Sequence, residues 1–121
     1  MPTFDEIVKD AKDRRNEIID KEKEISHELA LTNDDADVDR LTAMEKAYID
    51  SREMLDLVTL QALDKSVEIA SIKEKIQKVI DDLDETKAKI QKWGKIAEGV
   101  TAVLTGLNDL AEKIKTIAPK K

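Results

Sequence analysis

Residues 41–58 read LTAMEKAYIDSREMLDLV, and their apolar side chains recur at intervals of three and four residues. Stepping by sevens from the first leucine, every position to the end of the chain is apolar. These positions are Leu41, Tyr48, Leu55, Ala62, Ile69, Ile76, Leu83, Ile90, Ala97, Leu104, Ala111 and Ala118. A heptad seam of this kind is typical of helices that bury one stripe against another helix. The seam predicts an all-α fold, an antiparallel coiled coil or helical bundle.

The composition agrees with long helices. Charged residues make up 40% of the chain and aromatic residues 2%, with 3 glycines and 2 prolines. The absence of cysteine excludes a disulfide framework, a thiolate nucleophile and a cysteine zinc site. The first residues lack the pattern of a secretory signal, and no window is apolar enough to span a membrane. We therefore expect a soluble, cytoplasmic, single helical domain over residues 1–121.

Helix boundaries follow from capping residues and from one polar cluster. Thr3 and Glu6 have the spacing of a capping box, which predicts a helix start. The cluster TNDDADVD at 32–39 favours a turn, and Gly94 is the next residue that interrupts the helical pattern. The expected elements are a helix at 3–31, a loop at 32–36, a long helix at 37–93 and a C-terminal helix at 95–118.

Two architectures compete for the middle of the chain. In a compact four-helix bundle, the chain would turn at Asp64 to Ser66 and again near Gly94. In an extended molecule, one long central helix would run through Lys65, which occupies a companion position of the heptad, three residues after the seam position Ala62. We favour the long helix, because the seven-residue phase passes through Lys65 without a shift.

A second apolar stripe accompanies the seam. One partner helix cannot cover both stripes, because the residues of the second stripe lie away from the seam: Leu57, Leu60, Leu63, Val67 and Ala70. This pattern predicts a homodimer or a higher homo-oligomer. The expected self-association or partner face consists of Leu55, Leu57, Val58, Leu60, Leu63, Val67, Ile69, Ile72 and Ile76.

Charge is distributed unevenly along the chain. Residues 1–85 carry a net charge of −11 and residues 86–121 a net charge of +5, which together give the overall −6. Opposite charges set the orientation of packed helices more than they add stability. We expect the basic C-terminal part to lie along the acidic remainder or along a partner copy.

The C-terminal segment also allows an alternative function at a membrane. Lysines gather around Trp93 before a broad apolar face, an arrangement used by interfacial amphipathic helices and pore-forming toxin components. The membrane-facing set in this alternative is Trp93, Ile96, Val100, Val103, Leu104 and Leu107. The last helix of a bundle explains the same pattern, and we favour that interpretation.

Motifs for metal chemistry are incomplete. Glu24 and His27 have the spacing found in carboxylate-bridged di-iron bundles, but the second such motif is missing. The acidic run that begins at Asp35 resembles the start of a calcium loop. Arg40 and Lys46 stand where that loop needs glycine and glutamate, which excludes an EF-hand.

No residue set for nucleophilic or phosphoryl chemistry is recognisable, and we expect no catalytic residues, cofactor or metal. Nucleic acid is an unfavourable partner, because the acidic majority of the chain would repel phosphate. The sequence therefore predicts a non-enzymatic scaffold or adaptor that self-associates or binds another protein through coiled-coil faces.

Overall fold

The computed structural model describes residues 3–64 and 69–116, and within them it contains four α-helices and no strand. The elements are α1 (Phe4–Leu31), α2 (Asp35–Asp64), α3 (Ile69–Lys87), a short 3-10 helix η1 (Ala88–Ile90) and α4 (Gly94–Lys115). The predicted all-α fold is confirmed. None of the described helices is long and apolar enough to cross a membrane.

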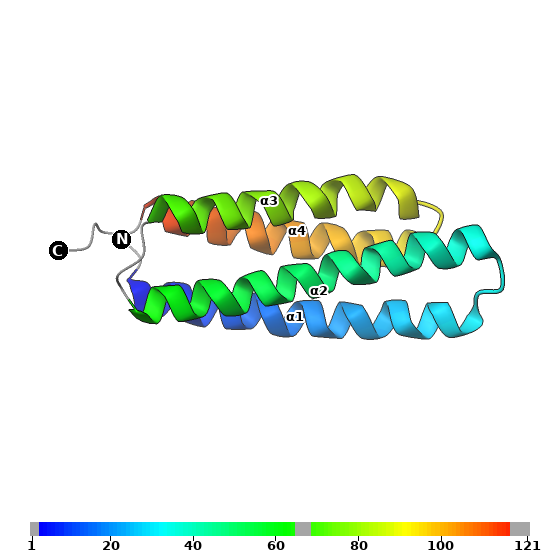
Figure 1. Ribbon diagram of the computed structural model, residues 1–121, viewed down its shortest axis with the longest axis horizontal. Helices are drawn as coiled ribbons and strands as arrows, with labels where there is room; N and C mark the ends of the chain where they lie inside the picture. Colours follow the sequence, from blue (N-terminus) through cyan, green and yellow to red (C-terminus); the bar gives the residue numbers. More distant parts are fainter. Residues whose placement is uncertain (1–2, 65–68, 117–121) are drawn as a thin grey trace.

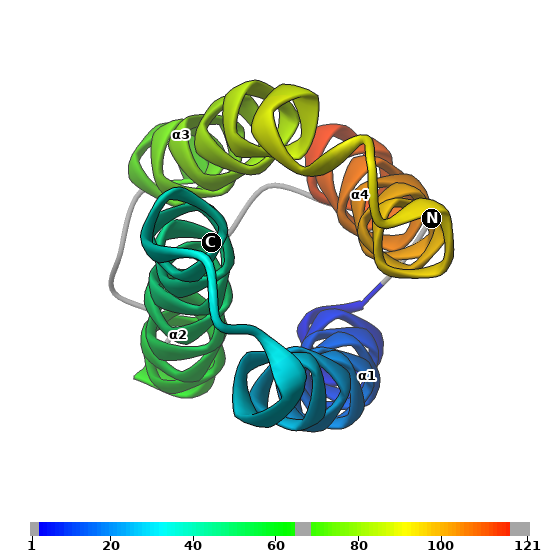
Figure 2. The ribbon, with the colours of Figure 1, turned by 90° about the vertical axis from the view of Figure 1, so that its right-hand side faces the viewer.

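The helices form an antiparallel bundle in which each one packs on two neighbours (Figure 1). The contacts run in a ring from α1 to α2, α3, α4 and back to α1, and within the described helices no backbone contact crosses the diagonals. Seen from its end, the bundle shows the four helices in this order around a common centre (Figure 2). The core therefore lies along the axis of the bundle.

The predicted long helix at 37–93 is wrong, and the compact four-helix alternative describes the molecule. α2 ends at Asp64, and α3 begins at Ile69 and lies beside α2. A heptad phase shows which face of a helix is buried, but two successive antiparallel helices both turn that face to the core. The phase can therefore persist where the chain reverses. Lys65 and Ser66 lie outside the described residues.

The core is built from the heptad seam. The buried seam positions are Leu41, Tyr48, Leu55, Ile76, Leu83, Ile90, Ala97 and Leu104. Most companion positions three residues later are buried as well, among them Met44, Val58, Val79 and Leu107. Fully burying one large aliphatic side chain stabilises the fold by about 1.5–3 kcal/mol relative to leaving it exposed. The seam and its companion positions together supply most of the buried apolar side chains, and α1 adds a further set that includes Ile7, Ile18 and Ile25.

The helix starts show which side chains set the boundaries. The Thr3 hydroxyl accepts a hydrogen bond from the backbone of Glu6 at 3.2 Å, as the capping box predicts. α2 begins earlier than expected, because Asp34 Oδ1 accepts from the backbone of Asp37 at 3.0 Å and caps the helix. The connection between α1 and α2 is therefore residues 32–34 rather than 32–36.

The C-terminal helix runs from Gly94 to Lys115, so it starts one residue before the expected 95–118 and ends earlier. Trp93 is its N-cap residue and provides no side-chain hydrogen bond. Lys113 and Lys115 stand in the last turn, where cations interact favourably with the helix dipole.

Candidate interaction surface

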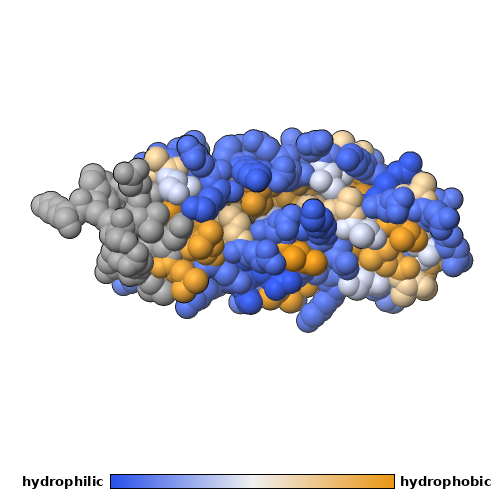
Figure 3. Space-filling view, viewed as in Figure 1, coloured by the Kyte–Doolittle hydropathy of each residue, from blue (hydrophilic) through white to orange (hydrophobic). Residues whose placement is uncertain are grey.

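The outer side of α2 carries two exposed leucines. Leu57 is 41% exposed and Leu60 is 64% exposed, while their neighbours Leu55 and Val58 are fully buried. The heptad explains the difference, since Leu57 and Leu60 fall on outward positions where polar residues are usual. Figure 3 shows such apolar patches interrupting a mostly hydrophilic surface.

The predicted partner face divides between the core and the surface. Its seam members are buried within the chain's own bundle: Leu55, Val58, Ile72 and Ile76. Leu57 and Leu60 remain exposed, and the side chains of Leu63, Val67 and Ile69 lie outside the described part of the structure. In this fold, only the outward leucines of the described set are available to a partner.

The membrane-facing set of the alternative function is almost entirely internal. Its buried members have exposed fractions of 8% or less: Ile96, Val100, Val103, Leu104 and Leu107. Trp93 is partly buried and packs at the edge of the core. The folded bundle therefore does not present this apolar face on its surface.

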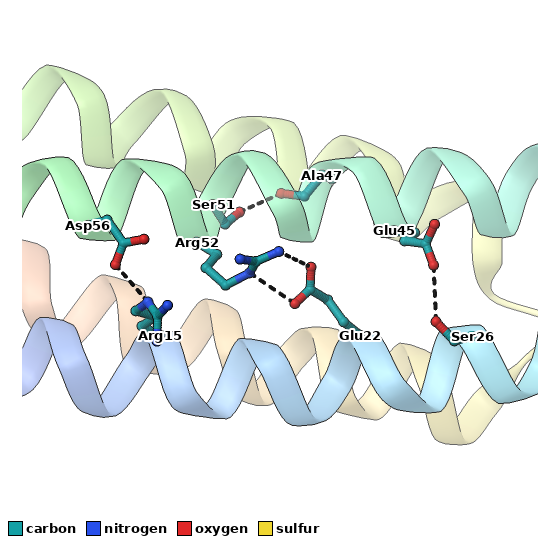
Figure 4. A network of polar contacts seen from close by, with 8 residues as sticks. All are labelled: Arg15, Glu22, Ser26, Glu45, Ala47, Ser51, Arg52 and Asp56. Carbon is teal, nitrogen blue, oxygen red and sulfur yellow. Dashed lines mark hydrogen bonds and ion pairs between the residues drawn. The ribbon is translucent and has the colours of Figure 1, made fainter.

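Polar contacts between α1 and α2 tie these helices together along their outer side (Figure 4). The cross-helix partners are Arg15 with Asp56 at 2.6 Å, Arg52 with Glu22 at 3.1 Å, and Ser26 with Glu45 at 3.2 Å. Arg52 donates two hydrogen bonds to the Glu22 carboxylate, and these bonds raise the pKa of the guanidinium. The charges along this seam are thus largely neutralised within the chain.

A groove between α2 and α3 differs from the α1/α2 interface in the pairing of its charges. This α2/α3 groove encloses about 330 Å³ and is lined by Asp50, Glu53, Met54, Leu57, Lys75, Lys78, Val79 and Asp82. Apolar side chains form its floor, acidic side chains of α2 form one wall, and lysines of α3 dominate the other wall. Among the described residues, no ion pair joins α2 to α3.

Sequence reasoning missed the charged walls of the α2/α3 groove. Glu53 and Lys78 occupy outward heptad positions, where charged residues are ordinary in any helix. The signal in the sequence is the opposite sign of these two side chains, negative at Glu53 in the α2 segment and positive at Lys78 in the α3 segment. It becomes informative only once α3 is known to lie beside α2.

A second groove, between α1 and the start of α4, brings together residues that are distant in sequence. It encloses about 320 Å³ and is lined by Glu24, His27, Glu28, Trp93, Gly94, Lys95 and Ile96. The Lys92 ammonium lies 4.8 Å from the centre of the Trp93 ring, within the range of a cation–π contact. Among the described residues, no group of three or more acidic or histidine side chains is placed to hold a metal ion.

The basic C-terminal part contacts the acidic part of the chain at two points, as the charge distribution predicts. Lys92 pairs with Asp37 at 2.5 Å, and Lys113 pairs with Asp10 at 3.3 Å. The hydrogen bond from Lys92 is the main cause that holds the pKa of Asp37 below its ordinary value, with Arg40 contributing. These pairs help to fix α4 and its preceding turn against α1 and α2.

Comparison with known protein families, with curated protein sequences and with solved structures finds no match for the chain.

Proposed function

We propose that this protein is a non-enzymatic helical interaction module, a small scaffold that self-associates through the outer face of α2 and α3. The observation that carries the proposal is the exposed Leu57, which lines the α2/α3 groove beside the nearly buried Met54 and Val79. The exposed Leu60 lies three residues further along α2, on the side toward α1. Single exposed leucines are common on protein surfaces, but two exposed leucines three residues apart on one helix, beside a groove lined by apolar and charged side chains, favour an interaction site.

The geometry also supports a protein partner rather than a small molecule. The α2/α3 groove is a shallow channel between two straight helices, and both walls carry charged side chains. Helical faces recognise one another through this combination of an apolar stripe and flanking charges. A second helical surface therefore matches the groove in shape and in chemistry.

Sedimentation equilibrium tests the proposal. Between about 1 µM and about 1 mM, the range in which weak dimers dissociate, the mass should rise from one chain of 13.6 kDa toward twice that value. Replacing Leu57 and Leu60 together by serine should keep the protein monomeric over this range. Because both side chains are exposed, the helix content and the thermal melt should change little.

A matched control is available at the other end of the bundle. Leu31 is 65% exposed and lies outside the proposed face, so Leu31→Ser should leave the association unchanged. A mass of one chain at every concentration would contradict the proposed function. An association that survives the loss of both leucines would also contradict it.

A further inference from the structure

The charges of the α2/α3 groove point to a specific arrangement of two copies. Glu53 on α2 and Lys78 on α3 both line the groove, and no ion pair joins them. The α1/α2 seam pairs its cross-helix charges, as Arg52 with Glu22 illustrates. The α2/α3 groove therefore carries acidic side chains on α2 and lysines on α3 without an ion pair between the two helices. These charges are suited to pair with the same groove of a second copy.

We propose that a second copy docks on the α2/α3 groove about a two-fold axis parallel to the helices, so that α2 of each copy lies over α3 of the other. This inference rests on the proposed self-association and adds its orientation. Dimers of identical chains nearly always use such two-fold axes, and the interface is then formed by the same patch on both copies.

Two face-to-face arrangements are compatible with two-fold symmetry. An axis parallel to the helices places α2 over the partner's α3, and an axis across the helices places α2 over the partner's α2. In the second arrangement, the wall of α2 with Asp50 and Glu53 would lie over the same acidic wall of the partner, and the wall of α3 with Lys75 and Lys78 would lie over the partner's α3. Like charges placed opposite each other are strongly unfavourable at an interface. The charge pattern therefore selects the parallel axis.

The parallel axis also preserves the level of each residue along the bundle. α2 and α3 are consecutive and antiparallel, so residues at similar distances from the end of α2 and the start of α3 lie at similar levels (Figure 1). Glu53 is 11 residues before the end of α2 and Lys78 is 9 residues after the start of α3, while Leu57 and Lys75 are 7 and 6 residues from these ends. In the dimer, Glu53 of one copy comes over Lys78 of the other. The alkyl stem of Lys75 covers the partner's Leu57, as long cationic side chains often do.

One contact in this arrangement is unfavourable. Asp50 and Asp82 line the same end of the groove, so Asp50 of one copy approaches Asp82 of the other. This like-charge contact predicts that replacing Asp82 by lysine strengthens the dimer. The opposite orientation predicts no such gain, because an axis across the helices places α3 over the partner's α3, so Asp50 does not meet Asp82.

The size of the face sets the expected strength. The 19 residues of α3 span roughly 28 Å, and two helices side by side are about 20 Å wide. The footprint is therefore roughly 560 Å², smaller than the about 800 Å² per partner of a standard interface. We expect a weak dimer whose association falls as salt screens the paired walls.

Charge reversal tests the orientation. Glu53→Lys and Lys78→Glu should each weaken self-association about tenfold, since symmetry repeats every contact and reversal turns attraction into repulsion. Mixing the two single variants should restore a heterodimer, because each reversed charge then meets an opposite charge on the partner. The double variant should associate with itself about as well as the unmodified protein.

A control and a decisive comparison complete the experiment. Glu98→Lys changes an exposed charge on α4, outside the groove, and should leave the association constant unchanged. Preferential pairing of the Glu53→Lys variant with the unmodified protein would overturn the parallel axis. The new lysine would then have to lie over Glu53 of the other copy, which only the axis across the helices allows.

The outcomes separate this inference from the proposed function. If the dimer depends on Leu57 and Leu60 but mixing the Glu53 and Lys78 variants restores nothing, the orientation is wrong and the self-association stands. If the unmodified protein stays monomeric, both proposals fall.

Discussion

Replacing Tyr48 by phenylalanine should stabilise the protein. Tyr48 lies in α2 with only 1% of its surface exposed, and its hydroxyl has no hydrogen-bond partner among the described residues. A buried hydroxyl without a partner costs about 1–3 kcal/mol of desolvation. Phenylalanine keeps the ring and removes that cost, so we expect the free energy of unfolding to rise by about 1 kcal/mol near neutral pH. The melting temperature should rise by about 4 °C.

The same substitution should act more strongly at alkaline pH. Burial, and then the nearby carboxylates of Glu24 and Glu17, raise the pKa of Tyr48 well above its ordinary value of 10.0. Below that ordinary value the stability is fully present. Above it, the unfolded chain ionises while the folded chain does not. At about pH 11 the protein should lose about 1.4 kcal/mol that the phenylalanine variant keeps.

Urea unfolding followed by circular dichroism, at about pH 7 and about pH 11, measures both effects. Tyr48 is the chain's single tyrosine, so tyrosinate absorbance reports its ionisation directly. Ser51→Ala is the matched control, because the buried Ser51 hydroxyl donates to the Ala47 carbonyl at 2.7 Å. That variant should show no added stability at alkaline pH. A phenylalanine variant that is less stable at neutral pH, or a gap that does not widen with pH, would refute the reasoning.

Three further predictions concern other parts of the bundle. Leu55→Ala should cost about 2–5 kcal/mol of unfolding free energy, whereas Leu57→Ala should stay within about 0.5 kcal/mol, and equal losses would place Leu57 in the core. Asp37→Asn should lower the melting temperature near neutral pH and flatten its fall in acid. The paired carboxylate stabilises the fold above its ordinary pKa of 3.8, and that contribution disappears as the pH drops through the lower folded value. Trp93 emission should not shift to the blue with anionic vesicles, because the apolar face behind it is buried, and a shift would favour the membrane-active alternative.

Periodicity predicted the buried face of each helix but not where the chain reverses. Leu41, Tyr48 and Leu55 lie in the core as the seam predicts. The end of α2 at Asp64 could not be predicted, because the sequence nearby has no glycine or proline and the heptad phase continues. The heptad phase shows which face of a helix is buried. This phase is the same whether that face packs against another chain or against the next helix of the same chain.

The candidate surface was predictable only in its apolar part. The second stripe on α2 identified Leu57 and Leu60 as residues that a single partner helix could not cover. The opposition of Glu53 and Lys78 depends on α3 folding back beside α2, at a particular level along the bundle. Such information is tertiary, so no local pattern in the sequence contains it.

The interfaces between neighbouring helices differ in whether their charged side chains are paired. This difference is our reason for placing a partner at the α2/α3 groove. At the interface of α1 and α4, a side chain at Gly106 would overlap the Arg14 guanidinium, and one at Gly99 would come within 3.2 Å of the Lys21 side chain. These glycines leave room for the Arg14 and Lys21 side chains of α1 beside α4, and Lys113 of α4 pairs with Asp10 of α1 at 3.3 Å.

Together with the pairs that join α1 to α2, these contacts neutralise charges of α1 on both of its flanks. The α2/α3 groove has facing charges of opposite sign without such pairs in the described residues, and its floor is apolar. A protein surface that leaves both kinds of group unsatisfied gains more from association than one that pairs its charges internally. For this reason the α2/α3 face, rather than the more elaborate polar network on α1, is where we place the partner.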